Sequence, residues 1–240
     1  MADPMTALLA PMRAAVQQYD MITPGDHVAV GVSGGKDSVA LLAALARLRR
    51  FYPVSFSLTA ITLDPCFDGQ PGDFTPIEEL CRELEVPYIL KHTKLWEVVF
   101  QERQEQNPCS LCARMRRGVL HRTAIEAGCR VLALAHHQDD AVQTFWMNLM
   151  EGGTLGCFSP KSYLDRRDLT LIRPFAFVQE ATIISAVRRL ALPVIPSRCP
   201  VDGCTHRGQA SEQLKELSRL YGPVNQKILH ALQKAGLSGW

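Results

Sequence analysis

A short segment rich in glycine and serine, residues 33–38, carries the residue types that hold a polyphosphate: it reads Ser-Gly-Gly-Lys-Asp-Ser. Glycines let backbone N–H groups approach phosphate oxygens closely, and the lysine adds positive charge. The spacing is not that of a Walker A motif, whose lysine directly precedes the hydroxyl residue. A simpler alternative is a turn in which Ser33 only caps a helix, but capping does not require two glycines. The segment therefore predicts nucleotide binding.

The cysteine pair Cys109 and Cys112 offers a second chemistry, because two thiols at this spacing can share one metal centre. A structural zinc ion, an iron–sulfur cluster, a redox dithiol and a disulfide all use such a pair. Zinc or a cluster needs more ligands, and Cys199 and Cys204 follow downstream. The other four cysteines each stand alone in the sequence, and we expect them to be ordinary small side chains: Cys66, Cys81, Cys129 and Cys157.

Acidic and imidazole groups follow two further apolar runs. Asp64 closes the run 58–63, and the sequence His-His-Gln-Asp-Asp occupies residues 136–140 after another apolar segment. We expect His136 either to line a nucleotide pocket or to cap a loop. Asp139 has the position of a helix cap, which leaves Asp140 as the carboxylate expected to act chemically.

Strand and helix patterns alternate along the chain and would bring these groups together. Strands are expected at 28–32, 55–63, 88–90, 131–135 and 169–172, and helices at 38–50, 77–84, 111–127, 139–150 and 181–190. This order predicts an α/β fold, with a parallel sheet that carries helices on both faces. In such sheets ligands gather at the carboxyl ends of the strands. The stretches 64–76 and 152–168 are interpreted as long loops.

Composition predicts one cytoplasmic domain. The 240 residues are 47% hydrophobic and 21% charged, which suits a single α/β domain over 1–240 with an N-terminal helix at 1–22 and a C-terminal helical segment at 205–240. Eight cysteines could indicate a secreted disulfide scaffold, but the chain is too long for one and lacks a signal-peptide pattern. We expect no membrane partner, since no apolar run reaches the ~20 residues of a membrane span.

Basic residues are clustered even though the net charge is only +2. Such clusters can neutralise backbone phosphates of an RNA, although a solvated surface is the plainer interpretation. They lie at 114–122, at Lys161, Arg166, Arg167 and Arg173, and at Arg198, His206 and Arg207.

The motifs together resemble a known family. The segment 33–38 resembles the pyrophosphate loop of the PP-loop ATP pyrophosphatases, and the run that begins at Cys109 resembles the tRNA 2-thiocytidine synthetase family within them. The segments 133–144, 171–175 and 199–203 also fit, so the resemblance runs from about residue 25 to residue 221.

The resemblance implies ATP-dependent transfer of sulfur to a tRNA base, with C2 of a cytidine as the expected site. It implies a 4Fe–4S cluster on Cys109, Cys112 and Cys199, together with Mg²⁺, a homodimer, and sulfide or a cysteine desulfurase as sulfur donor. Expected catalytic residues are Lys36, Asp37, Arg116 and Asp140. Expected ATP-binding residues are Ser33, Gly34, Gly35, Lys36, Asp37, Ser38, Asp64 and His136.

Two other classes of function stay open at this point. An adenylating enzyme of the same fold could act on a different tRNA base or on a small molecule, and it would need no cysteine cluster. A non-catalytic sensor could bind ATP and a cluster without releasing pyrophosphate. Zinc at the same cysteines is a further alternative to the cluster.

Overall fold

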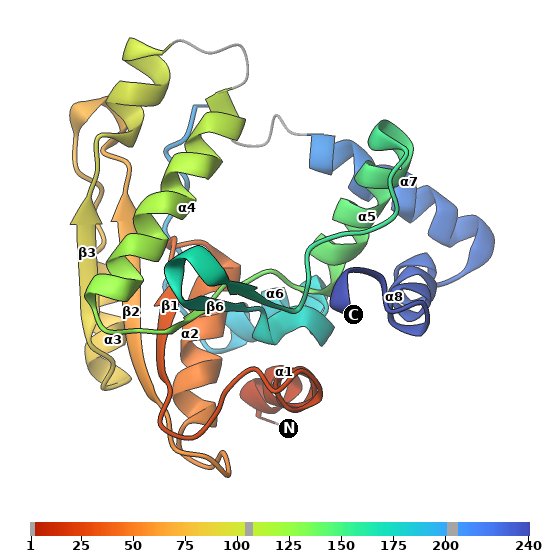
Figure 1. The fold of residues 1–240 in the computed structure, drawn as a ribbon, viewed down its shortest axis with the longest axis horizontal. Coiled ribbons are helices and arrows are strands. Elements are labelled where there is room, and N and C mark those ends of the chain that lie inside the picture. The colour runs from red at the N-terminus through yellow and green to blue at the C-terminus, as the bar shows by residue number, and fades with distance from the viewer. Residues whose placement is uncertain (1–2, 104–107, 201–205) are drawn as a thin grey trace.

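One six-stranded sheet organises the chain (Figure 1). The structure is a computed structural model that describes residues 3–103, 108–200 and 206–240. The strand order is β3-β2-β1-β4-β6-β5, and every pairing is parallel except that of β5 with β6. The strands are β1 (His27–Gly31), β2 (Ser57–Asp64), β3 (Tyr88–His92), β4 (Val131–Ala133), β5 (Lys161–Leu164) and β6 (Leu169–Ile172).

The α-helices cover both faces of this sheet and extend beyond its edge. Their bounds are α1 (Pro4–Gln18), α2 (Lys36–Leu48), α3 (Thr75–Glu83), α4 (Pro108–Glu126), α5 (Gln138–Gly152), α6 (Glu180–Arg189), α7 (His206–Tyr221) and α8 (Val224–Lys234). Shorter helical turns are η1 (Phe67–Gly69), η2 (Glu97–Glu102), η3 (Asp165–Arg167), η4 (Pro174–Phe177) and η5 (Leu237–Gly239). No helix in these described ranges is both long and apolar enough to cross a membrane.

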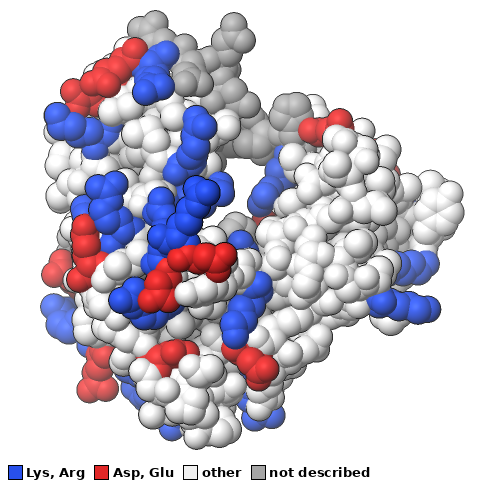
Figure 2. All heavy atoms as spheres, in the orientation of Figure 1, with Lys and Arg blue, Asp and Glu red and all other residues white. Residues whose placement is uncertain are grey.

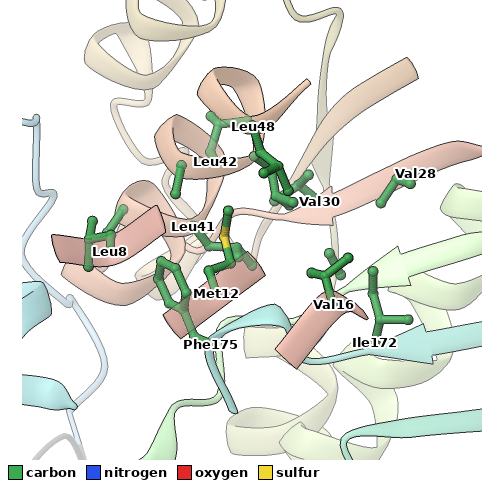
Figure 3. Close-up of a cluster of buried hydrophobic side chains, with 14 of the residues drawn as sticks. Leu8, Met12, Val16, Val28, Val30, Leu41, Leu42, Leu48, Ile172 and Phe175 are labelled. Atoms are coloured by element: carbon green, nitrogen blue, oxygen red, sulfur yellow. The ribbon is translucent and has the colours of Figure 1, made fainter. Parts of the chain in front are cut away.

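Side-chain alternation in the strands divides the core into two layers. Val28 and Val30 of β1 join the larger cluster, whereas Ala29 between them joins the smaller one. The larger cluster draws on α1, α2, α3 and α6; Figure 3 shows α1 and α2 meeting β1 and Phe175 there. The smaller cluster includes Ala124 of α4, which packs on β2 and β4. The two faces are therefore covered by different helices.

The C-terminal helices are attached to α5, the helix that follows β4. Both α7 and α8 pack against α5. The Trp146 indole N–H donates to Gln213 of α7 (2.8 Å), and the Asn225 amide of α8 donates to Asp139 (2.9 Å). Because α5 begins just beyond the carboxyl end of β4, these contacts bring the start of α7 toward the carboxyl ends of the strands.

The structure corrects several expected boundaries. The stretch 152–168, expected to be a loop, contains β5, a four-residue edge strand whose Tyr163 is 58% exposed. So short and exposed a strand leaves little pattern in a sequence. The segment η2 was also not predicted. The N-terminal helix, expected over 1–22, ends at Gln18, and Asp20 then adopts a positive φ of 46°.

Truncation of Phe175 tests the larger core layer. Its side chain is fully buried, so Phe175→Ala should lower the free energy of unfolding by about 3–5 kcal/mol. Phe51 is 51% exposed and supplies the control: Phe51→Ala should change that free energy by about 0.5 kcal/mol or less. Urea denaturation measures both, and equal effects would contradict this packing.

Candidate functional site

The phosphate loop connects β1 to α2 and is fixed at both ends. The Val32 N–H donates to Ile61 (2.8 Å), and the Thr62 hydroxyl donates to the Val32 carbonyl (2.7 Å). The Ser38 hydroxyl accepts from the Ser33 N–H (3.1 Å) and donates to the Gly35 carbonyl (2.9 Å). Gly35 caps α2 without any side-chain acceptor, so N–H groups of the first turn are left for an anion.

Gly34 is the position in this loop that requires glycine. Its φ is +87°, a conformation that residues with a Cβ rarely adopt. A Cβ there would also lie 3.1 Å from the Ile195 side chain, whose backbone N–H donates to the Gly34 carbonyl at 2.9 Å. The close approach of the segment around Ile195 therefore depends on this glycine.

A cavity of about 600 Å³ opens beside the loop, at the carboxyl ends of the strands. It lies where the strand order reverses, between β1 and β4, which is the usual ligand position in an open α/β sheet. The structure brings seven of the expected site residues to its wall: Ser33, Gly35, Asp37, Ser38, Arg116, His136 and Asp140.

Three of the other expected site residues, Gly34, Lys36 and Asp64, are not among the residues that line this cavity. The Lys36 ammonium pairs with Asp37 and with Glu180 of α6, each at 2.9 Å. Burial lowers the pKa of Lys36, but the hydrogen bonds to these carboxylates and their charges outweigh it and raise that pKa. The lysine is therefore cationic and joins the loop to α6.

Asp64 is bound by the loop that follows β2 and by the end of β3. Its carboxylate accepts from the backbone N–H groups of Cys66 and Gly72 and is paired with His92, all at 2.9 Å. Burial raises the pKa of Asp64, yet these hydrogen bonds outweigh it and lower the pKa. The carboxylate is thus ionised, and it organises this loop.

Asp140 has two partners at the start of α5. Its Oδ2 accepts from the His137 N–H (3.0 Å), and His137 in turn caps the helix, so Asp140 completes a capping box. Its Oδ1 accepts from the Arg207 guanidinium of α7 (2.6 Å). Asp139 does not cap the helix; it binds the Glu180 N–H (2.7 Å) and Asn225 instead.

His136 is a neutral group in the cavity wall. Burial lowers its pKa to about 4, and the positive charge of Arg173 contributes to the shift. Its ring lies 5.0 Å from the Phe158 ring, over which Arg173 also sits at 4.8 Å. A neutral imidazole here can donate or accept a hydrogen bond without adding charge.

The wall of the cavity carries four arginines: Arg116, Arg117, Arg173 and Arg207. Burial lowers the pKa of Arg173 to about 10, so it remains cationic near neutral pH. A second hollow of about 470 Å³ adjoins α4 and is lined by Arg114, Arg117, Arg166 and Arg167. Figure 2 shows basic side chains gathered on this face of the molecule. The field at both hollows favours anions.

Cys112 interacts electrostatically with two further cysteines, Cys109 and Cys199. Cys109 and Cys112 are in α4, and Cys112 immediately precedes Ala113, which lines the cavity. Burial raises the pKa of the Cys112 thiol; the Arg116 charge opposes the shift, and the charges of Cys199 and Cys109 add to it. The Cys112 thiol is therefore within electrostatic range of both other cysteines. Cys204 lies outside the described residues.

These three thiols can be compared with the ligand spacing around a bound zinc ion. Tetrahedral zinc, with Zn–S bonds of about 2.3 Å, holds its sulfur ligands about 3.8 Å apart. Within the described part of the chain, the three cysteines form no group whose ligand atoms all lie within 4.8 Å of one another. Three cysteine thiolates are a ligand set for an iron–sulfur cluster and, with a fourth ligand, for zinc.

The sequence did not single out Arg207, Arg117, Arg173 or Glu180 as site residues. Only the basic clusters gave a signal for the arginines, and that signal does not separate a cavity wall from a solvated surface. Glu180 lies 144 positions from its partner Lys36 in the numbering and left no local pattern. Such pairings follow from tertiary packing.

With this geometry in place, comparison with known proteins identifies the family. Residues 9–194 match the PP-loop domain, so the chain belongs to the PP-loop family. The relatives carry a more particular name. A tRNA-cytidine(32) 2-sulfurtransferase from Pelobacter propionicus is 36% identical over 247 residues, which cover 96% of this chain and 91% of the relative. One from Geobacter sulfurreducens is 38% identical over 221 residues, with 91% and 85% covered. The chain therefore belongs to the tRNA-cytidine 2-sulfurtransferase family.

A solved structure has the same fold. The U34-tRNA thiolase NcsA from Methanococcus maripaludis, with its [4Fe-4S] cluster, matches with a TM-score of 0.78 at 23% identity. The match covers 97% of this chain and 79% of that chain. The expectation of a PP-loop α/β fold is confirmed.

Arg207 provides a direct test of the cavity. Arg207→Met removes a positive charge and the partner of Asp140, and we expect kcat/KM for ATP to fall at least about tenfold, a loss of about 1.4 kcal/mol. Arg219, an exposed residue near the end of the same helix, supplies the control Arg219→Met, which should leave kcat/KM unchanged. Equal kinetics for the two variants would contradict a role for Arg207 in this cavity.

Proposed function

We propose that the protein uses ATP to replace the C2 oxygen of a tRNA cytidine with sulfur, at position 32 as in the names of its relatives. The observation that carries the proposal is the position of α4. One stretch of this helix holds Cys109 and Cys112, and the next turn contributes Arg116 and Arg117 to the cavity beside the phosphate loop. The proposed nucleotide site and the Cys109–Cys112 pair of α4 thus adjoin each other.

The first step activates the base. The C2 oxygen is a poor leaving group, so it attacks the α-phosphorus of ATP, forming a C2–O–AMP bond and releasing pyrophosphate. The N–H groups at the start of α2 and the Arg116 guanidinium stabilise the charge that develops on the phosphates. Asp37 and the Ser38 hydroxyl offer oxygen ligands at the same place, and Asp37 would hold Mg²⁺.

The second step forms a C–S bond and breaks the C–O bond. Sulfide adds to C2, AMP leaves with the bonding electrons, and the sulfur loses its proton to give the thiocarbonyl. Asp140 orients the base or accepts this proton, and Arg207 fixes its carboxylate. When bound to Cys109, Cys112 and Cys199, a 4Fe–4S cluster supplies an iron with an open position that can carry sulfur.

The partners follow from this chemistry. ATP occupies the cavity, and the tRNA backbone crosses the adjoining hollow lined by Arg114, Arg117, Arg166 and Arg167. Sulfide, or a cysteine desulfurase that generates bound sulfur, is the donor. The active form is proposed to be a cytoplasmic homodimer, as the family resemblance implies.

Cysteine variants test the sulfur-transfer reaction. Anaerobically purified wild-type protein should hold about four irons and four sulfides and convert tRNA to 2-thiocytidine, which mass spectrometry of digested nucleosides detects. Cys109→Ala, Cys112→Ala and Cys199→Ala should each lose the cluster and reduce thiolation at least about a hundredfold, while the unaltered phosphate loop still binds ATP.

Cys157→Ala is the matched control, because this half-buried thiol donates to the Phe158 carbonyl while the backbone N–H of Cys157 donates to Ser238. It should retain both the cluster and thiolation. Zinc alone, or no metal, in the wild type would overturn the cluster-dependent mechanism. A cluster and ATP binding without any tRNA thiolation would instead indicate a sensor or a different substrate.

The arginine-lined hollow can be tested separately. The double variant Arg166→Gln/Arg167→Gln should weaken tRNA binding about tenfold and reduce the slope of log affinity against log salt by about 0.7–0.9 for each phosphate that these arginines neutralise. Arg47→Gln/Arg50→Gln, which removes two exposed cations near the end of α2, is the control and should leave binding unchanged. Filter binding across a salt series measures both. Equal effects of the two double variants would argue against this hollow.

A further inference from the structure

Side chains of three different metal-ligating types meet at the carboxyl ends of β2 and β3. The proposed reaction does not use this position. Asp64 ends β2, His92 ends β3, and these two residues are direct partners in the parallel register of the two strands. Cys66 follows Asp64 by two positions. Among the described residues, these three form the group whose ligand atoms all lie within 4.8 Å of one another.

The distances within this group suit one small ion. Asp64 Oδ2 lies 2.9 Å from His92 Nδ1, and Cys66 Sγ lies 3.6 Å from that oxygen and 3.9 Å from that nitrogen. Tetrahedral zinc, with Zn–S of about 2.3 Å and Zn–N or Zn–O of about 2.0–2.1 Å, separates such ligand atoms by about 3.3–3.6 Å. Small side-chain shifts would convert the observed distances among these three atoms into those of a zinc site.

The carboxylate of this group is held in place by other contacts. Asp64 is 2% exposed, and backbone N–H groups of Cys66 and Gly72 donate to its two oxygens, each at 2.9 Å. The Thr93 hydroxyl donates to the Asp64 carbonyl (2.9 Å). The two N–H donors orient the carboxylate as hydrogen bonds to a metal-ligating carboxylate do, and they remain possible after an ion binds.

One coordination position would remain open. A cavity of about 330 Å³ adjoins the group and is lined in part by Cys66, His92, Trp96 and Glu97. His92 is 53% exposed in its side chain, so the group can be reached from solvent. Three protein ligands beside an accessible cavity are the arrangement of an exchangeable zinc site rather than a closed structural one.

We propose that Asp64, Cys66 and His92 bind a zinc ion at a site separate from the three cysteines and the nucleotide cavity. The mixed set of one carboxylate, one thiolate and one imidazole matches the ligand preference of zinc. This inference rests on the geometry at the ends of β2 and β3 and is independent of the proposed reaction.

The site would also stabilise the surface on which the segment of Cys199 rests. Arg198, its neighbour in sequence, donates to the carbonyls of Phe67 (3.2 Å), Gln70 (3.4 Å) and Pro71 (3.1 Å). These carbonyls belong to the loop that begins with Cys66. An ion that fixes this loop therefore also fixes the position of the Cys199 segment.

The test uses cluster-loaded protein with one equivalent of added zinc, because absorption at the zinc edge is distinct from that of iron. We expect about one zinc per chain, with a first shell of one sulfur at about 2.3 Å and nitrogen or oxygen ligands at about 2.0–2.1 Å. Zinc should also raise the thermal midpoint of unfolding. Cys66→Ala and His92→Gln should each weaken zinc binding at least about tenfold and abolish that rise.

Cys157→Ala is the control and should bind zinc as the wild type does. Asp64→Asn is unsuitable as the deciding variant, because the carboxylate also holds its loop in the absence of metal. A first shell of three sulfurs would place zinc on Cys109, Cys112 and Cys199 and overturn the proposal. Absence of zinc, or zinc binding unaffected by Cys66→Ala, would overturn it as well.

Discussion

Parallel pairing of β1 with both β2 and β4 is the constraint on which the rest of the structure depends. The register pairs Val30 with Ala60 on one side and with Ala133 on the other, so the three strands end at the same edge. The chain moves outward from β1 through β2 to β3 and then returns to start β4 on the other side. The phosphate loop after β1 and the His136 segment after β4 therefore face one cavity.

The charged groups around the cavity favour an anionic ligand. The carboxylates of Asp37 and Asp140 are each paired with a cation, Lys36 and Arg207 respectively, so neither leaves an uncompensated negative charge in the wall. His136 is held neutral by burial, and four arginines line the space. A polyphosphate can enter such a site, and an RNA backbone can follow the arginines of α4 outward.

The sequence predicted the phosphate loop and the elements beside it, because the residue types in that one stretch determine their structure. The phosphate loop, the strand before it and the helix after it lie within a short stretch, and their residue types specify a strand, a glycine turn and a helix start. The pair Cys109 and Cys112 in α4 could likewise be recognised from the spacing of the two residues. Seven of the expected site residues line the cavity, which fits the expectation that strand ends and loops converge.

The remaining features depend on tertiary packing that no local pattern records. Arg207 reaches Asp140 across 67 positions because α7 packs on α5. The register of β2 with β3 pairs Asp64 with His92, a contact that the sequence did not predict. Cys66 was expected to be an ordinary small side chain, yet its sulfur lies beside the Asp64 carboxylate because its backbone turns into the left-handed region (φ 52°).

The measurement that tests the central claim most directly follows the C2 oxygen itself. An anticodon stem-loop whose target cytidine carries ¹⁸O at C2 is incubated with cluster-loaded protein, ATP and sulfide, and the released AMP is analysed by mass spectrometry. Activation of the base by adenylation predicts that AMP acquires one ¹⁸O for each 2-thiocytidine formed. Thiolated product accompanied by unlabelled AMP would contradict adenylation of the base.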